Sequence, residues 1–346
     1  MVLELTDELI AYDDSDERLV VECISNLLLG YYESNHFLLA SELFCSYFSG
    51  LISEGRVSRA LNHLRNNNGV YPDVMWTKKV RLDKNVTKGD DDLPISFFQK
   101  TVSIQPSVLL CENFLDVKFY TRLCEEYHSA YGLALNGMMG GGQTTKDVFR
   151  KLRRSNQISL TIVDSDIKYP GAPKGATASG VESINANRLA HVGLYVLKVH
   201  EVENLIPFDC LYEHSYKGKA KVFMRKLKAK GLYKYIQYYD VKHGFRTKDV
   251  KDSAGLKSYA EQLYNDIFPK SKGKFSKFLK ECQTKDDESG REGKAGVFPA
   301  LRCDMLDKFL ECSNQISQSD IFEPERKHIA DLVYTYACAR SKDVIM

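Results

Sequence analysis

The sequence predicts an α/β protein with a central parallel sheet flanked by helices, and with helical regions at both ends of the chain. Strand-like apolar runs alternate with helical patterns across residues 96–250, and this alternation favours a parallel sheet covered by helices. Helical spacing of apolar residues dominates residues 1–95 and 251–346. The sequence therefore predicts three domains with these boundaries.

The first domain, residues 1–95, is expected to be helical. Apolar residues recur at helical spacing from Glu17 to Tyr32. Shorter patterns of the same kind follow at 37–51 and 57–64. Residues 82–94 are polar and are predicted to form a linker to the next domain.

The central domain is expected to contain short buried strands separated by helices. We expect strands at 108–111, 133–135, 158–163 and 194–199, and helices at 116–131 and 144–154. Ligands of such sheets bind beyond the carboxyl ends of the strands. The residues at the strand ends are therefore the first candidates for a functional site.

The third domain, residues 251–346, is expected to be helical again. Its predicted helices lie at 258–267, 274–282, 305–312 and 324–339. Residues 283–296 have almost no apolar side chains and are predicted to be a loop.

The composition argues against a membrane protein, a secreted protein and a zinc-binding protein. The 346 residues are 43% hydrophobic and 27% charged, with a formal net charge of +2, which is typical of globular proteins. No apolar stretch approaches the roughly 18 residues of a membrane span, and the acidic N-terminus does not resemble a secretory signal. The nine cysteines lack metal-binding spacing, which indicates reduced thiols and a cytoplasmic location.

Three carboxylates follow two of the expected strands. Glu112 comes after the first strand, and Asp164 and Asp166 come after the third. If these strands are neighbours, the three carboxylates converge at one edge of the sheet, where their mutual repulsion favours a divalent cation. Mg²⁺ and Mn²⁺ prefer such oxygen ligands. The alternative is that the Asp-x-Asp pair lies in a solvated turn before the Pro/Gly-rich loop.

The order of these motifs resembles a Toprim domain, the metal-binding module of topoisomerases, primases, small ribonucleases and OLD-family nucleases. The family pattern is a glutamate after the first strand, a glycine after the second and Asp-x-Asp after the third. Glu112, Gly137 and the pair Asp164/Asp166 match it in order. Many Toprim domains have Glu-Gly where this chain has Glu112-Asn113, and the insert after Asp166 is long.

A second stretch extends this resemblance. The sequence VLKVHEVENLIP at 196–207 is similar to the strand ending in EIEN of OLD nucleases and of the Toprim-like effectors that work with ATPase partners in bacterial anti-phage systems. It adds Glu201 and Glu203 as candidate acidic residues. The stretch YYDVKHGF places Asp240, Lys242 and His243 at another expected strand end.

The resemblance implies a nuclease with two Mg²⁺ or Mn²⁺ ions. Glu112, Asp164 and Asp166 would be the main ligands, and Glu201 or Glu203 would complete the second metal or orient water. Lys242 would stabilise charge in the transition state, or it is an ordinary surface lysine. His200 is interpreted as a structural histidine or as one that supports a ligand.

The resemblance also bears on substrates and partners. It implies cleavage of RNA, tRNA among them, or of DNA, as an effector of anti-phage defence. The chain has no ATPase motif, so an ATPase or sensor would be a separate protein; a homo-oligomer is a further option. The alternatives are a Toprim-like module that binds nucleic acid or nucleotide without cutting, and a purely structural scaffold.

A basic segment, residues 215–239, is a candidate nucleic-acid interface. It has no acidic residue, and aromatic side chains are interleaved with its cations, a combination that suits phosphate contacts and base stacking. The alternative is a solvated helix face whose aromatic residues pack inward. The candidate phosphate-binding residues are Lys217, Lys219, Lys221, Arg225, Lys226 and Lys228.

Overall fold

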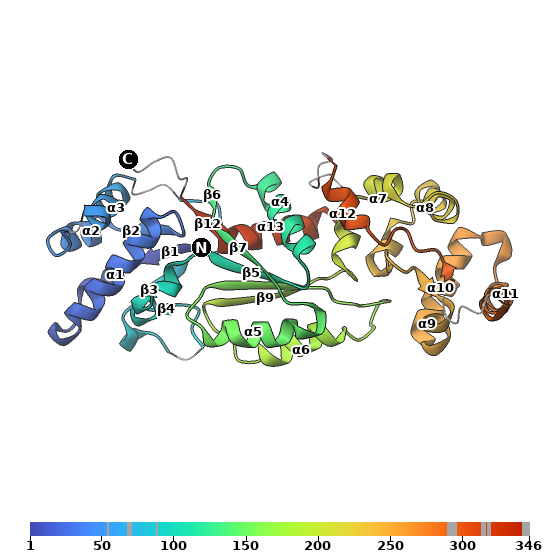
Figure 1. Cartoon of the computed structure of the whole chain (residues 1–346), viewed down its shortest axis with the longest axis horizontal. Helices are drawn as coiled ribbons and strands as arrows, with labels where there is room; N and C mark the ends of the chain where they lie inside the picture. The colour runs from blue at the N-terminus through green and yellow to red at the C-terminus, as the bar shows by residue number, and fades with distance from the viewer. Residues whose placement is uncertain are drawn as a thin grey trace. The chain divides into compact units, whose positions relative to one another are not determined.

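The computed structural model describes residues 1–53, 55–67, 71–87, 89–288, 296–312, 316 and 320–340. The chain forms two compact units, each of which is described by itself (Figure 1). The first unit comprises Met1–Val163, Gly180–Tyr195 and Lys327–Met346, and the second comprises Asp164–Ser179 and Val196–Arg326. The three domains expected from the sequence, with boundaries at residues 95 and 250, stay a prediction.

A four-stranded sheet with the order β7-β5-β8-β9 lies in the first unit. Its strands are Leu135–Met139, Ser107–Cys111, Ser159–Val163 and Val192–Val196. β5 pairs in parallel with both neighbours, so that Leu109 lies opposite Gly137 on one side and Leu160 on the other. Every residue of β5 and β8 is buried, as expected for strands covered on both faces.

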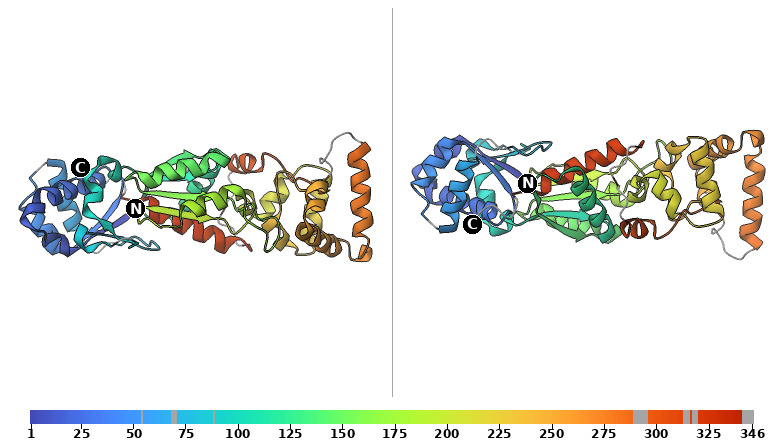
Figure 2. Two further views of the ribbon diagram at one scale, coloured as in Figure 1. Left: turned by 90° about the horizontal axis from the view of Figure 1, so that it is seen from below. Right: turned by 90° about the horizontal axis from the view of Figure 1, so that it is seen from above.

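Helices flank this sheet on both sides (Figures 1 and 2). One side carries α4 (Phe114–Tyr127) and α13 (Glu323–Ala337), and the other carries α5 (Thr145–Arg154) and α6 (Ala176–Ile184). The chain reaches β7 on one side of β5 and then crosses to β8 on the other, and right-handed crossovers place the two connecting helices on opposite faces. The predicted α/β class, with parallel sheets flanked by helices, is confirmed.

The N-terminal region is not purely helical, and this part of the prediction is wrong. It contains a second sheet with the order β2-β1-β3-β4, in which β1 pairs in parallel with β2 and β3, and β3 pairs in parallel with β4. Its strands are Val2–Leu5 (β1), Phe37–Ala40 (β2), Lys78–Arg81 (β3) and Leu93–Pro94 (β4). Its helices are α1 (Glu17–Tyr32), α2 (Glu42–Ser49) and α3 (Gly55–Asn66).

The missed strands are too short to have a period of their own. Four contiguous apolar residues, such as Phe37–Ala40, fit a buried strand and a buried helix equally well. The expected helix at 37–51 divides at Ser41, whose hydroxyl accepts a hydrogen bond from the Phe44 N–H at 2.9 Å and caps α2. The helical pattern of α1, by contrast, extends over 16 residues, and it predicted the bounds of this helix correctly.

The second expected strand of the central sheet also differs from the structure. The segment at 133–135 divides into β6 (Gly132–Leu133), which pairs antiparallel with β12 (Cys338–Ala339), and β7. Gly137 therefore lies within β7 and not after it. A Cβ atom at Gly137 would lie 2.5 Å from Cγ1 of Val117, so the absence of a side chain lets α4 pack closely on the strand.

Replacing Gly137 with alanine is expected to lower the free energy of unfolding by about 1–3 kcal/mol, because a β-branched neighbour gives little room for an added methyl group. Urea unfolding followed by circular dichroism measures the change. Gly55→Ala is the matched control: its Cβ would meet nothing within 4 Å, and it is expected to be neutral or stabilising by up to about 1 kcal/mol. Equal stability of wild type and Gly137→Ala would contradict the close approach.

The second unit is mostly helical. Its helices are α7 (Phe208–His214), α8 (Lys219–Ala229), α9 (Thr247–Asp252), α10 (Ala254–Ile267), α11 (Phe275–Glu288) and α12 (Met305–Leu310). A short antiparallel pair joins β10 (Phe245–Arg246) to β11 (Gly296–Phe298). The prediction of a loop at 283–296 is wrong for residues 283–288, because they continue α11. Residues 289–295 lie outside the described part of the chain.

Aromatic side chains form much of the core of the second unit. The centre of the Tyr239 ring lies 5.2 Å from the centre of the Phe223 ring and 4.9 Å from that of Phe245. The Phe298 ring packs against Phe245 and completes the group. Tyr235 is also buried. In the described part of the chain, no helix has both the length and the apolar character needed to cross a membrane.

Candidate metal centre

Glu112 lies directly after β5 in the first unit and is half-buried. The next residue, Asn113, is the N-cap of α4: its side-chain oxygen accepts hydrogen bonds from the N–H groups of Leu115 (2.8 Å) and Asp116 (3.1 Å). The Asp116 carboxylate accepts in return from the Asn113 N–H at 3.0 Å. The departure from Glu-Gly thus has a structural role, since it starts the helix.

The loop after β7 holds the backbone at Glu112. The N–H of Gly141 donates to the Glu112 carbonyl at 2.9 Å, and the N–H of Gly140 donates to the Cys111 carbonyl at 2.8 Å. Gly141 has a φ of 75°, a left-handed conformation that glycine adopts without strain. The glycine-rich stretch therefore fixes the chain at the carboxyl end of β5.

Asp164, Ser165 and Asp166 follow β8 and belong to the second unit. The Asp164 carboxylate accepts a hydrogen bond from the Val202 N–H at 3.0 Å. Ser165 is buried and its hydroxyl donates to the Val199 carbonyl. Asp166 is exposed.

Asp166 has an unusual backbone conformation. Its φ is 54°, a left-handed value that aspartate tolerates better than most residues. Its N–H donates to the His200 carbonyl at 2.9 Å. A Cβ atom at Gly175 would lie 2.1 Å from the Asp166 carboxylate, and the Gly175 N–H donates to the Ser165 carbonyl at 2.8 Å. The long insert after Asp166 therefore returns to pack against this carboxylate.

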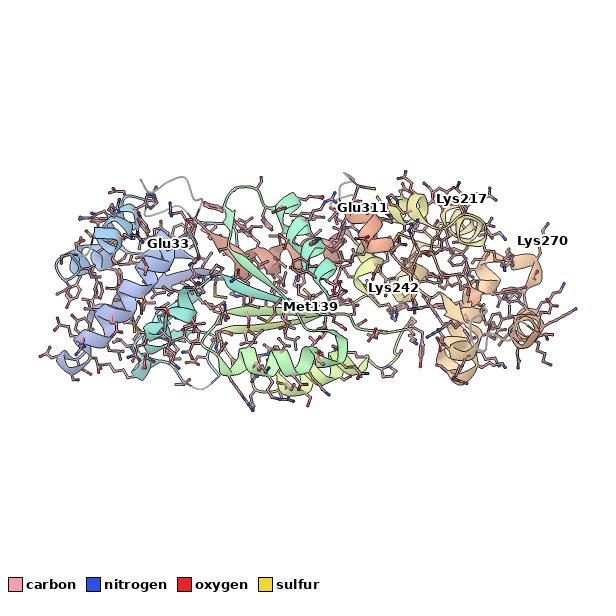
Figure 3. The ribbon with its side chains drawn as sticks, viewed as in Figure 1. Glu33, Met139, Lys217, Lys242, Lys270 and Glu311 are labelled. Carbon is pink, nitrogen blue, oxygen red and sulfur yellow. The ribbon has the colours of Figure 1, made fainter. Side chains whose placement is uncertain are left out.

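Glu201 and Glu203 share one lysine. Lys242 Nζ lies 3.1 Å from Glu201 Oε2 and 2.8 Å from Glu203 Oε1 (Lys242 is labelled in Figure 3). The side chains of the two glutamates are 8% and 3% exposed, against 30% for the lysine. β9 ends at Val196, and a short 3₁₀ turn spans Val202–Leu205. The stretch that carries Glu201 and Glu203 is therefore a turn, and from it both carboxylates reach Lys242.

Burial and charge both act on the protonation of this group. Burial raises the pKa of Glu201 to about 8, the Glu203 carboxylate adds to the rise, and Lys242 opposes it. Burial lowers the pKa of Lys242, but Glu203 and Glu201 outweigh burial, and the net result is a pKa above the ordinary value. Asp164 acts on Lys242 in the same direction as the glutamates. Lys242 is therefore an ammonium ion among acidic side chains.

Asn204 ties these acidic residues to the segment that carries Asp240 and Lys242. It is fully buried. Its oxygen accepts from the Glu201 N–H at 2.7 Å, and its NH₂ donates to the carbonyls of Ile236 (2.7 Å) and Tyr239 (2.8 Å). The Val241 N–H donates to Glu201 Oε1 at 2.8 Å. The asparagine of the VEN sequence is thus a positioning residue.

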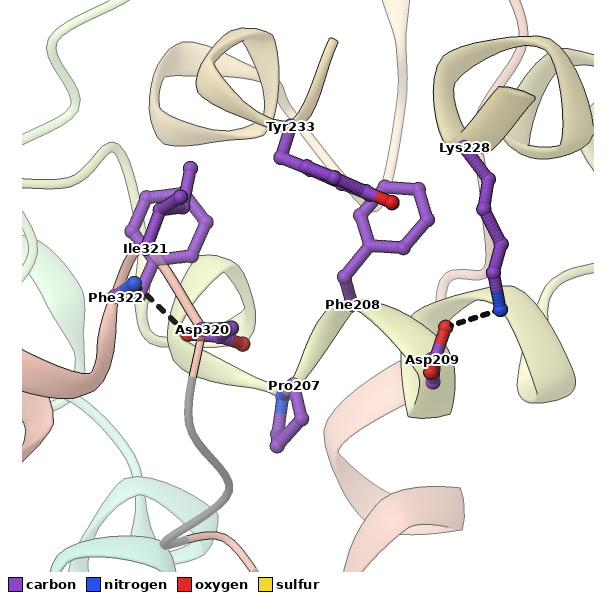
Figure 4. Close-up of a pocket in the computed structure, with 8 residues that line it drawn as sticks. All are labelled: Pro207, Phe208, Asp209, Lys228, Tyr233, Asp320, Ile321 and Phe322. Atoms are coloured by element: carbon purple, nitrogen blue, oxygen red, sulfur yellow. Dashed lines mark hydrogen bonds and ion pairs between the residues drawn. The ribbon is translucent and has the colours of Figure 1, made fainter. Parts of the chain in front are cut away.

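Half of the candidate nucleic-acid-binding residues already have partners within the second unit. Lys221 donates to the carbonyls of Tyr212 and Glu213, and Lys226 lies 4.0 Å from the centre of the Phe268 ring. Lys228 is paired with Asp209 at 2.6 Å, at the edge of a pocket of this unit (Figure 4). The residues left for phosphate contacts are Lys217, Lys219 and Arg225, and Lys217 is labelled in Figure 3.

The aromatic residues of this segment mostly pack inward. Phe223, Tyr235 and Tyr239 are buried, whereas Tyr216 is exposed. Base stacking on the three buried rings is therefore excluded, and the predicted nucleic-acid interface of this segment depends on its exposed residues; the choice between the interface and a solvated helix face stays open.

The structure brings together Asp164, Glu201, Glu203 and Lys242, with Asp166 and Asp240 close by in the second unit. Glu112 belongs to the first unit, so its convergence with the aspartates stays a prediction. Comparisons of the chain with protein-family models, with curated proteins and with solved structures found no match.

Proposed function

We propose that this chain is a Toprim-fold nuclease that uses Mg²⁺ or Mn²⁺ to hydrolyse phosphodiester bonds in RNA or DNA. The observation that supports it best is the charge of the group around Lys242. Asp164, Glu201 and Glu203 all act on that one ammonium ion, which leaves an excess of negative charge in a largely buried place. A divalent cation offsets such an excess.

The residues present fit an ion of this kind. Glu203 is 2% exposed, and its Oε2 has no hydrogen-bond partner among the described residues, so a carboxylate oxygen is available there. Asp164 and Asp166, with Glu112 from the first unit, are the proposed main ligands, and Glu203 or Glu201 would contribute to a second ion. Mg²⁺ or Mn²⁺ lowers the pKa of a bound water and stabilises charge on the phosphate.

Lys242 is proposed to stabilise the negative charge that develops on the phosphate oxygens. An ammonium group has three donors, and the two glutamates accept from two of them. The remaining donor suits a phosphate oxygen, and the partial exposure of Lys242 allows substrate to reach it. Glu201 and Glu203 would then position the ammonium group as well as contribute negative charge.

Cleavage assays test the proposal directly. Wild type and Glu112→Ala are incubated with Mg²⁺ or Mn²⁺ and with labelled tRNA, single-stranded DNA and supercoiled DNA. We expect cutting by wild type alone, abolished by a chelator. Binding by both proteins without cutting would favour the alternative, a non-cleaving module that holds nucleic acid or nucleotide for a partner subunit. If Asp164→Asn changes neither binding nor a cellular phenotype, the chain is a scaffold.

A role in defence against phage rests on the family resemblance. We propose that the chain acts in the cytoplasm with a separately encoded ATPase or sensor that controls it. Expression of the chain alone, with and without Glu112→Ala, tests the effector role: growth arrest that the substitution relieves supports a nuclease that damages the host. Arrest that the substitution leaves unchanged would point to toxicity of another kind.

Replacing Lys217, Lys219 and Arg225 together with alanine is expected to weaken nucleic-acid binding and its salt dependence. Each lost phosphate contact reduces the slope of log K against log salt by about 0.7–0.9, so a decrease of about 2 is expected. Fluorescence anisotropy over a range of salt concentrations measures it. Lys228→Ala, which removes a cation already paired with Asp209, is the matched control, and an equal loss in both proteins would contradict the assignment.

A further inference from the structure

His200, Glu201 and Asp240 form a second donor group in the second unit. Each offers one ligand atom, and the three atoms lie within 4.8 Å of one another. His200 and Glu201 are buried and Asp240 is half-buried. The three residues come from the two segments that Asn204 joins, so their backbones are held together independently of any ion.

His200 supplies an independent indication of a ligand. Its side chain is buried, with the residue 4% exposed, and Nδ1 has no hydrogen-bond partner among the described residues. The backbone at this position is fixed on both sides, because its N–H donates to the Gln237 carbonyl at 2.8 Å and its carbonyl accepts from the Asp166 N–H at 2.9 Å. A buried ring nitrogen without a partner is unusual in folded proteins.

His200 differs in this respect from the two carboxylates of the group. The neighbouring carboxylates are already satisfied in part: Glu201 by Val241 and Lys242, and Asp240 by the His243 N–H at 2.7 Å.

We propose that His200, Glu201 and Asp240 bind a divalent transition-metal ion such as Mn²⁺, Co²⁺ or Zn²⁺, at a site that does not include Asp164 or Asp166 and that leaves Glu203 as the acidic residue for the second magnesium ion. An imidazole nitrogen favours these ions over Mg²⁺, which prefers oxygen ligands alone. Two carboxylates balance the charge of the ion. This site depends on contacts within one unit and exists whether or not the chain cleaves nucleic acid.

Metal titrations of the full chain test the site without an activity assay. Protein freed of metal by a chelator is titrated with Co²⁺ in an excess of Mg²⁺, and the visible absorption of protein-bound Co²⁺ is recorded. We expect wild type to bind Co²⁺, and His200→Gln and Asp240→Asn to bind it at least 10-fold more weakly. The matched control is His191→Gln, because His191 also has a ring nitrogen without a partner but belongs to the first unit.

Unchanged Co²⁺ binding in His200→Gln, or an equal loss in His191→Gln, would overturn the site. A measurement on wild type alone covers the case in which the variants do not fold. Pulsed electron paramagnetic resonance of the Mn²⁺-loaded protein is expected to show coupling to an imidazole nitrogen, and absence of this coupling would also overturn it. Because neither readout involves cleavage, a failure here is distinct from a failure of the proposed nuclease function.

Discussion

Replacing Lys242 with methionine is expected to lower the free energy of unfolding at pH 8 by about 3–5 kcal/mol, the cost of leaving a buried charge without its partner. Two carboxylates lose their common cation in this variant, since Lys242 Nζ lies within 3.1 Å of both Glu201 and Glu203. Methionine keeps most of the aliphatic length of lysine. Urea unfolding of wild type and variant measures the difference.

The size of this effect depends on pH in a defined direction. Burial and the neighbouring Glu203 carboxylate raise the pKa of Glu201 above the ordinary glutamate value of 4.5, and loss of the ammonium group removes an interaction that opposes this rise. A carboxyl whose pKa is raised by folding supports the folded state while it is protonated and destabilises it as the pH rises toward the folded-state value. The penalty is therefore expected to be small near about pH 4 and to grow as the pH rises through the range up to pH 8.

Two further variants distinguish the loss of charge pairing from a loss of packing. Adding Glu203→Gln to Lys242→Met removes one of the stranded charges and is expected to restore part of the stability at pH 8. Lys248→Met changes an exposed lysine of α9 and is expected to stay within about 0.5 kcal/mol of wild type. A pH-independent loss in Lys242→Met would show that packing, and not charge, accounts for the change.

Asp166→Asn is expected to reduce metal-dependent cleavage at least about 100-fold, because loss of a residue that supports a metal ligand already costs 10- to 100-fold. The substitution removes only the negative charge: asparagine tolerates the φ of 54° found at Asp166. The free energy of unfolding should therefore be unchanged, or slightly raised by the lower repulsion. Cleavage rates at saturating Mg²⁺ and thermal unfolding with and without Mg²⁺ give the two readouts.

The control for this variant is Asp252→Asn, an exposed aspartate on α9 of the same unit. It is expected to keep both the cleavage rate and the stabilisation by Mg²⁺. If Asp166→Asn cleaves at the wild-type rate, Asp166 is not a ligand of the catalytic metal. A loss of cleavage together with a large loss of stability would instead assign a structural role to this carboxylate.

The elements that the sequence predicted well are a helix with a long periodic pattern and two strands that are mostly apolar. α1 has four turns of helical periodicity, and β5 and β8 are rich in Val, Leu and Ile and are buried throughout. β1 and β2 are four residues each, which is barely more than one helical turn, so their sequence does not distinguish a strand from a helix and they depend on pairing with distant strands. Pairing of that kind is tertiary information, which local patterns do not contain.

The candidate site shows the same division. Spacing along the chain placed Asp164 and Asp166 at a strand end, and the VEN sequence drew attention to Glu201 and Glu203. The family resemblance singled out Lys242 as well, but its shared contact with both glutamates, 41 residues beyond Glu201, is set by the turn that Asn204 organises and does not follow from the sequence. No spacing in the sequence connects Asp240 with His200, and only the folded chain brings both close to the Glu201 carboxylate.

The two compact units are interleaved along the chain, with the second interrupted by Gly180–Tyr195 and followed by Lys327–Met346 of the first. No single stop codon or proteolytic cut therefore releases one complete unit and spares the other. A premature stop anywhere between residues 164 and 326 removes segments of both, so a null phenotype from such a truncation does not assign an activity to either unit. Point substitutions that leave the backbone unchanged are the appropriate genetic tool for this molecule.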